Sequence, residues 1–210
     1  MKTQGLRLEQ APPLHLPLRF FLTAPLFGAA AGLMLVWRGA ELLASPWNPA
    51  TVALTHLIAL GFISMVMVGA VYQIMPVLVG IPLPRVGLAR WVHLGLCAGV
   101  AAMVAGLLTA NRPLLWLALA ALPAALAIFL GQLVAALARA PWGSATINSI
   151  RLAVLALALA ACLGAFSLWE YVFGWLPVDR RAVLAAHLYL ALGGWLGTLI
   201  TGVGKVVIQM

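Results

Sequence analysis

Two histidines near the starts of long apolar stretches could bind a metal or a cofactor between membrane helices. His56 begins the stretch HLIALGF, and His187 begins HLYLALGG. Imidazole nitrogens are common ligands of haem iron, zinc and copper. Both stretches continue with small residues and end in a similar patch, QIM in one and IQM in the other. The similarity indicates a weak internal repeat, with a gap of a residue or two.

The two histidines are expected to lie at one depth in the membrane. They fall about five residues into the second and the sixth of six predicted spans, which start on the same side, roughly 7 Å below the helix end at 1.5 Å per residue. Two imidazoles at one level suit the axial positions of a porphyrin-bound iron. We predict His56 and His187 as axial ligands of haem iron, with Gly61 and Gly194 letting the flat macrocycle approach the helices.

Two other interpretations of the histidine pair remain open. Each histidine could simply hydrogen-bond a neighbouring helix. A copper or zinc site is less favoured, because such a site normally needs a third or fourth ligand. Met34 and Glu170 are the nearest side chains of a suitable type on that side, and nothing in the sequence places them within reach.

Further polar residues lie toward the other side of the membrane. His93 begins the third span there and cannot bind the same iron, so it would serve a second haem site, a quinone, or only water and headgroups. Gln73 and Lys205 indicate either a polar cavity for a quinone head or a proton path, although a lysine near a helix end commonly extends to the interface.

The last span places several small and polar residues on one stripe. At 100° per residue this stripe contains His187, Gly194, Thr198, Thr201 and Lys205. Small and polar residues in a membrane helix usually face other helices or a bound group. We therefore expect this stripe to point inward.

The composition requires a polytopic α-helical membrane protein. The 210 residues are 65% hydrophobic and 8% charged, with a mean hydropathy of +1.11, which no soluble domain of this length matches. A transmembrane β-barrel would alternate polar and apolar residues, and these segments are apolar all round. We predict an all-α bundle in residues 18–210, preceded by a cytoplasmic segment, residues 1–17. The six predicted spans are 18–37, 51–79, 89–109, 113–138, 147–174 and 182–209.

Several classes of protein are disfavoured by what the sequence lacks. It contains no Walker, Rossmann or kinase motif, which argues against an ATP-driven or nicotinamide-dependent enzyme. Cys97 and Cys162 both fall inside spans and are interpreted as small buried residues without a disulfide. The net charge of +8 does not indicate nucleic-acid binding, because the basic residues lie at helix ends.

The basic residues predict the orientation of the spans. The side that holds the N-terminus, loops 2–3 and 4–5 and the C-terminus carries eight of them, namely Lys2, Arg7, Arg19, Arg85, Arg90, Arg139, Arg151 and Lys205. The other side carries Arg38, Arg112, Arg180 and Arg181. The richer side should be cytoplasmic. We expect a multi-pass protein of a bacterial inner membrane with both termini inside, and the Ala- and Leu-rich composition is compatible with a bacterial genome of high G+C content.

The two histidine stretches resemble the haem-copper oxidase subunit I-like superfamily and the NnrS-type membrane haem proteins linked to nitric-oxide metabolism. The similar segments are HLIALGFISMVMVGAVYQIMP and HLYLALGGWLGTLITGVGK, and PLRFFLTAPLFGAAAGLMLVW is similar to the first span of short members. The resemblance covers about a third of the chain. The resemblance implies that intramembrane histidines bind a b-type haem. Only His56 and His187 match the family's ligand positions.

The chain also departs from the oxidases. The oxidases have twelve or more spans and an adjacent histidine pair for copper, which this chain lacks, so a binuclear oxygen- or nitric-oxide-reducing centre is not expected within one chain. The chain ends at Met210, directly at the end of a span. We expect either that it is one half of an older, duplicated architecture and works as an oligomer, or that the sequence is incomplete.

The resulting hypothesis is a b-type haem protein in electron transfer or in nitric-oxide- or oxygen-related respiration. The haem would lie between spans 2 and 6 near the outer leaflet. The expected partners are the lipid bilayer, a redox protein or second copies of the chain, and a quinone. The alternative is a non-haem transporter, or a structural or assembly subunit of a respiratory complex.

Overall fold

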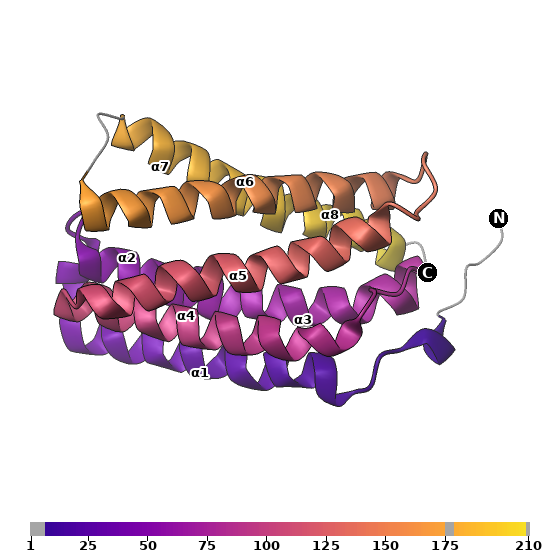
Figure 1. Cartoon of the computed structure of the whole chain (residues 1–210), viewed down its shortest axis with the longest axis horizontal. Helices are drawn as coiled ribbons and strands as arrows, with labels where there is room; N and C mark the ends of the chain where they lie inside the picture. The colour runs from indigo at the N-terminus through magenta and orange to yellow at the C-terminus, as the bar shows by residue number, and fades with distance from the viewer. Residues whose placement is uncertain (1–6, 175–178, 209–210) are drawn as a thin grey trace. The chain divides into compact units, whose positions relative to one another are not determined.

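A computed structural model of the chain describes residues 7–174 and 179–208 (Figure 1). Its described residues form helices, turns and loops, without strands. Six helical segments are long and apolar enough to cross a membrane, which confirms the predicted all-α fold with six spans. They are His15–Leu42, Pro49–Val79, Val86–Thr109, Arg112–Leu137, Ala145–Phe173 and Arg180–Lys205.

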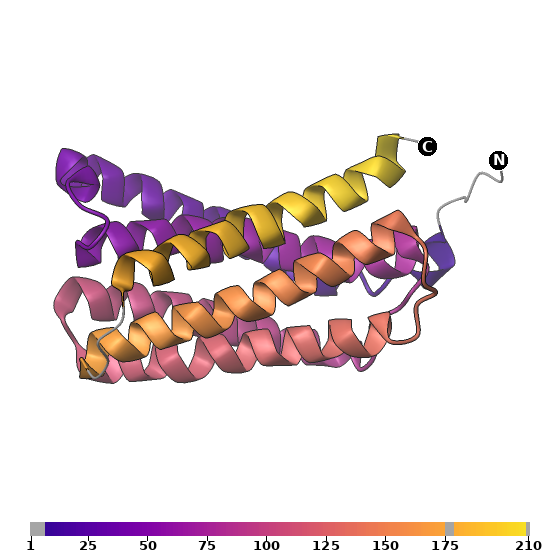
Figure 2. The ribbon, with the colours of Figure 1, turned by 90° about the horizontal axis from the view of Figure 1, so that it is seen from above.

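Backbone contacts divide the chain into two compact units. Unit 1 consists of Met1–Ala11, Ile74–Val86 and Leu126–Met210, and unit 2 consists of Pro12–Gln73 and Gly87–Ala125. Each unit contains a hairpin of two antiparallel spans, shown in Figure 1 and from a second direction in Figure 2. The N-terminal hairpin in unit 2 joins spans 1 and 2, and the C-terminal hairpin in unit 1 joins spans 5 and 6.

The N-terminal hairpin packs its two spans closely at two glycines. Helix α1 (His15–Arg38) lies against the second span, which is built from α2 (Pro49–His56), the π-helical segment η3 (Leu57–Ser64) and α3 (Met65–Ile74). A side chain at Gly61 would place its Cβ 2.7 Å from Phe27, and one at Gly69 would place it 2.8 Å from Phe20.

The C-terminal hairpin repeats this arrangement. Helix α6 (Ala145–Phe173) lies against the sixth span, built from α7 (Arg180–Leu188), the π-helical segment η6 (Tyr189–Gly197) and α8 (Thr198–Ile208). In Figure 2 these are the orange and yellow helices.

The contacts within the two hairpins correspond in spacing. Gly194 packs against Ala156, where an added Cβ would lie 2.5 Å away, and Gly202 packs against Ser149. The two glycines are eight residues apart and their partners seven apart, as in the N-terminal hairpin. The predicted internal repeat therefore has a structural counterpart in helix packing. Small residues at helix contacts are how membrane helices bring their backbones together.

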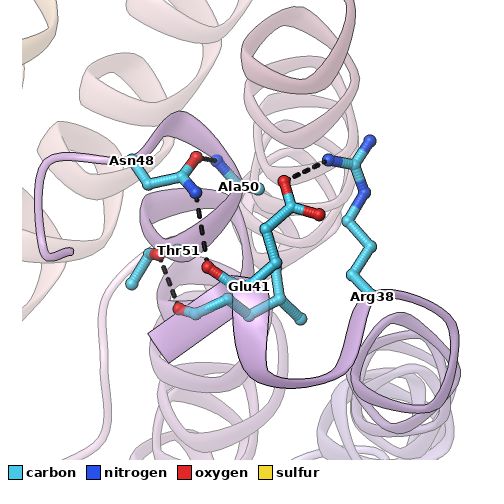
Figure 3. Close-up of polar contacts among 6 residues, drawn as sticks. Arg38, Glu41, Asn48, Ala50 and Thr51 are labelled. Carbon is cyan, nitrogen blue, oxygen red and sulfur yellow. Dashed lines mark hydrogen bonds and ion pairs between the residues drawn. The ribbon is translucent and has the colours of Figure 1, made fainter. Parts of the chain in front are cut away.

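A network of polar contacts closes the N-terminal hairpin between its two spans (Figure 3). The side chain of Asn48 caps α2, accepting a hydrogen bond from a backbone N–H two residues later at 3.0 Å. The hydroxyl of Thr51 donates to a carbonyl of the 3-10 turn η2 (Gly39–Leu43) at 2.6 Å. Within the same turn Glu41 forms an ion pair with Arg38 at 3.6 Å. The cap satisfies amides that helix geometry leaves without partners.

The C-terminal hairpin is closed by a capped helix start and an ion pair. Asp179 caps α7 by accepting from the backbone N–H groups of Arg181 and Ala182, at 2.9 and 3.3 Å. Arg180 forms an ion pair with Glu170 at the end of α6. The carboxylate is largely buried and the arginine is mostly exposed. Both hairpins thus present a side-chain cap where the histidine-bearing span begins.

Helices α4 (Ala89–Thr109) and α5 (Arg112–Leu137) connect the two hairpins in the chain. In unit 2, α4 packs against the start of α5, where an added Cβ at Gly99 would lie 2.6 Å from Leu122. In unit 1, the amide of Gln132 on α5 donates to the carbonyls of Pro84 and Arg85, at 2.8 and 3.1 Å. This bond holds the loop between spans 2 and 3 to the second half of α5.

Large apolar side chains remain on the outside of single helices. On α1 these include Leu22, Leu26 and Leu33, each about two-thirds exposed or more. The backbone hydrogen bonds of a helix are satisfied internally, so such a surface is stable in hydrocarbon. The exposed apolar faces are therefore the surface that contacts lipid.

One of two predicted boundaries near prolines requires correction. Helix α1 begins at His15 and not at residue 18, because Pro17 lies in its first turn, where a helix needs no N–H donor. The second span ends in a π-helical turn, η4 (Met75–Val79), followed by Gly80 with φ of 73°. The second span thus ends at residue 79, as predicted.

The predicted inward stripe on the last span is wrong in its second half. Thr201 and Lys205 are exposed, and the contact with α6 is made by Gly194 and Gly202. The reason is η6, since a π-helix has more residues per turn than an α-helix. The stripe drawn at 100° per residue therefore leaves the contact face after residue 197.

We predict that Gly61→Ala destabilises the protein and that Gly32→Ala does not. The new methyl at residue 61 would overlap Phe27, and overpacking typically costs about 1–3 kcal/mol. At Gly32 an added Cβ meets nothing within 4 Å, so the better helix propensity of alanine should leave stability unchanged or raise it by up to about 1 kcal/mol. Thermal unfolding in detergent compares the two, and equal melting temperatures would contradict the packing assigned to Gly61.

Candidate functional site

His56 and His187 occupy the same position in their helices. Each is the eighth residue of a helix whose first turn is capped by a side chain, Asn48 in α2 and Asp179 in α7. Each lies seven residues after the first residue of its helix, which is roughly 10 Å at 1.5 Å per residue. This is farther than the predicted 7 Å, because both helices begin two residues earlier than the sequence pattern indicated. The two histidines therefore occupy equivalent positions in their helices, as predicted.

Hydrogen bonds fix the same tautomer for both histidines. Nδ1 of His56 lies 2.8 Å from the carbonyl oxygen of Val52, one turn earlier in α2. Nδ1 of His187 lies 2.9 Å from the carbonyl oxygen of Ala160 on α6. A carbonyl only accepts, so Nδ1 must carry the proton, and the ring lone pair is then on Nε2. Histidines that bind metals through Nε2 are commonly oriented by this kind of bond.

Helix α6 contacts the imidazole of His187 at two consecutive turns. One turn after Ala160, which accepts the hydrogen bond, Gly164 faces the ring. An added Cβ at Gly164 would lie 3.0 Å from Cε1 of His187, closer than carbon atoms pack without strain. The ring is thus held by a carbonyl on one turn of α6 and by the absence of a side chain on the next.

A π-helical segment follows each histidine. Segment η3 has eight residues and starts directly after His56, and η6 has nine residues and starts two residues after His187. The π-helix is rare, appears mostly as single turns, and is frequent at functional sites. Two longer examples at matched places in two spans mark these spans as specialised.

The predicted cofactor glycines make helix contacts within their own hairpins. The space beside Gly61 is filled by Phe27 of α1, and the space beside Gly194 by Ala156 of α6. This packing explains why both residues are glycine. A contact of these glycines with a macrocycle stays a prediction. Helix packing within each hairpin already accounts for both glycines.

His93 lies in a separate cluster inside unit 2. Its Nε2 lies 2.9 Å from the hydroxyl of Thr23, which itself donates to the carbonyl of Arg19 at 2.7 Å. The hydroxyl has one proton, so Nε2 of His93 is the donor. Phe20 meets the ring edge-on at 5.2 Å between centroids, and Sγ of Cys97 lies 3.6 Å from Nε2. Nε2 of His93 is thus engaged by a hydrogen bond, and this geometry gives His93 a packing role. Its use as a second ligand site stays a prediction.

Other residues considered in the sequence are distributed over the two units. Gln73 has a buried side-chain oxygen that accepts no hydrogen bond from the described residues. Cys97 and Cys162 are both free thiols, Cys97 half-buried and Cys162 exposed. His15 is an exposed residue at the start of α1.

The two principal histidines belong to different units. His56 lies in unit 2 and His187 in unit 1, and each is placed by its own hairpin. Among residues 7–174 and 179–208 there is no group of three or more His, Cys, Asp or Glu side chains that could hold a metal ion.

Three features of the site were not found by sequence reasoning. Ala160 and Gly164 have no signal of their own, because their role depends on a partner that is distant in the chain. Thr23 is seventy residues from His93. The two helix caps could have been predicted from the sequence. Asn48 before a proline and Asp179 before two arginines are typical helix starts.

Comparisons with protein-family models, with curated proteins and with solved structures found no match to the chain. Its function is therefore argued from the residues and the geometry of the two hairpins.

We predict that Gly164→Ala displaces the imidazole of His187. The added methyl would press on Cε1 and lengthen the bond from Nδ1 to Ala160. The ¹⁵N resonances of His187, identified by comparison with His187→Ala, should shift in Gly164→Ala. Gly131→Ala on α5 is the control, because an added Cβ there meets nothing within 4 Å. Unchanged His187 resonances in Gly164→Ala would contradict the contact assigned between Gly164 and the imidazole of His187.

Proposed function

We propose that this multi-pass membrane protein is a b-type haem protein in which His56 and His187 supply the axial nitrogens. The observation that carries the proposal is the repeated placement of the two histidines. Each is the eighth residue of a capped helix, each has its Nδ1 bound to a carbonyl, and each precedes a π-helical segment. Independent packing roles would not require the same position, tautomer and helix type.

The donor set fits a haem. A porphyrin supplies the equatorial nitrogens itself, so the protein needs to contribute only one or two imidazoles. A zinc or copper ion bound by side chains alone normally takes three or four ligands. Both histidines carry the Nδ1–H tautomer, in which Nε2 can coordinate iron. The resemblance of these two spans to membrane haem proteins supports the same proposal.

Electron transfer is the role that two axial histidines favour. Haem supplies a one-electron redox centre, and a second imidazole occupies the position at which a gas would otherwise bind. The chain's own contribution is to orient the two imidazoles through Val52 and Ala160. If only one histidine binds iron, the remaining position would suit nitric oxide or oxygen, and the protein would act in nitric-oxide- or oxygen-related respiration.

An electron-transfer protein needs partners, which we propose to be a redox protein or a membrane quinone. A homo-oligomer is also proposed. Lys205 and Gln73 belong to the predicted cytoplasmic side, and Lys205 is exposed, as expected for a side chain that extends to an interface.

An optical spectrum with histidine variants tests the proposal. The purified protein should show sharp reduced α and β bands of low-spin haem b, and His56→Ala and His187→Ala should each lose haem or become high-spin. His15→Ala is the control, because His15 is exposed at the start of α1. Haem that survives unchanged in both ligand variants would overturn the assignment, with His93→Ala as the next variant. Absence of haem after expression with ample haem would favour the alternative, a transporter or structural subunit.

We further propose that the protein lies in a bacterial inner membrane with both termini in the cytoplasm. Basic residues are twice as frequent on the side of the termini, and this bias generally faces the cytoplasm. A fluorescent protein fused after residue 210 should therefore fluoresce, and a periplasm-dependent phosphatase at the same place should be inactive. The opposite pair of results would reverse the orientation.

A further inference from the structure

The indole of Trp195 has a buried hydrogen-bond donor without an acceptor. The side chain is 3% exposed, and its Nε1–H has no partner among the described residues. Leaving a buried polar group unpaired is destabilising, and native structures pair nearly all such groups with protein, water or a bound ligand. In a span surrounded by hydrocarbon, bulk water is not available to serve as the acceptor.

Trp195 lies inside η6, eight residues after His187. Its ring meets Phe129 of α5 edge-on, with 6.3 Å between centroids and an angle of 84°. On the preceding residue, Gly194, the span is in contact with Ala156 of α6. The ring of Trp195 is therefore in contact with Phe129 of unit 1, while its N–H has no acceptor among the described residues.

The hydroxyl of Thr198, one helical turn later, does not accept a hydrogen bond from the indole. This hydroxyl donates its proton to the carbonyl of Gly194. A tryptophan that only filled space at residue 195 would need no N–H, and phenylalanine would pack the same surface without this cost. The choice of tryptophan in the π-helical segment points to an acceptor outside the described residues.

We propose that Nε1–H of Trp195 donates a hydrogen bond to an oxygen of a bound lipophilic ligand. The shared chemistry is a carbonyl or carboxylate oxygen on a largely flat molecule. Two sources can supply it: the carbonyl of a membrane quinone, or a side-chain carboxyl group of haem. The haem source rests on the proposed function, and the quinone source does not.

Ultraviolet resonance Raman spectroscopy of the full chain in nanodiscs reads this bond directly. The tryptophan N–H band responds to hydrogen bonding, and the spectrum of wild type minus Trp195→Phe isolates Trp195. Decylubiquinone or haemin is added separately to the haem-free protein. The ligand that binds Trp195 should shift the isolated band toward a stronger hydrogen bond.

Binding affinity gives the second measurement. Trp195→Phe should bind that same ligand roughly fivefold to tenfold more weakly, as expected for one neutral hydrogen bond of about 1–1.4 kcal/mol. Trp37→Phe is the matched control, because Trp37 is 88% exposed at the end of α1. Its affinity for either ligand should equal that of wild type. Thermal unfolding of the two variants without ligand separates a folding defect from a lost contact.

The outcomes distinguish this inference from the haem proposal. If haem binds with low-spin bands and neither ligand shifts the indole band, the Trp195 proposal is overturned and the haem proposal stands. If no haem binds and decylubiquinone shifts the band, the Trp195 proposal stands on the quinone alone. A band that already reports a strong hydrogen bond without ligand, unchanged by both, would also overturn it, because the acceptor would then belong to the protein.

Discussion

The close approach of two antiparallel helices at a pair of glycines is the contact on which each hairpin depends. In lipid the apolar side chains gain little by leaving their surroundings, so helices associate where their backbones can come near each other. Gly61 and Gly69 allow this in one hairpin, and Gly194 with Gly202 in the other. The two glycines set the distance and the register between the spans. The position of each histidine relative to its hairpin follows from that register.

The C-terminal hairpin shows how packing and chemistry are connected. Because α6 and the last span are close, a carbonyl of α6 can reach Nδ1 of His187, and only a residue without a side chain fits at Gly164. The N-terminal hairpin reaches the same tautomer differently, through the carbonyl of Val52 in the histidine's own helix. The two histidines therefore have the same tautomer. The carbonyl that accepts the hydrogen bond belongs to the facing helix in one hairpin and to the histidine's own helix in the other.

Much of the fold was predictable from the sequence, because continuous apolar segments of this length are stable in lipid only as helices. The six spans and the equivalent positions of His56 and His187 follow from pattern alone. The contacts of His187 with Ala160 and of His93 with Thr23 were not predictable, since they join residues far apart in one sequence. The π-helical segments also have no sequence signature, and their presence made the stripe drawn through Thr201 and Lys205 incorrect.

The two spans also differ in the rotation between their histidine and their packing glycine. The histidine precedes the first packing glycine by five residues in one hairpin and by seven in the other. In a continuous α-helix, two extra residues rotate one end relative to the other by about 200°. Both spans have a π-helical segment in this interval, so the segments do not cancel the difference. The two imidazoles therefore leave their spans in different directions relative to the packing face, which agrees with their different carbonyl partners, Ala160 on the facing helix for His187 and Val52 in the same helix for His56.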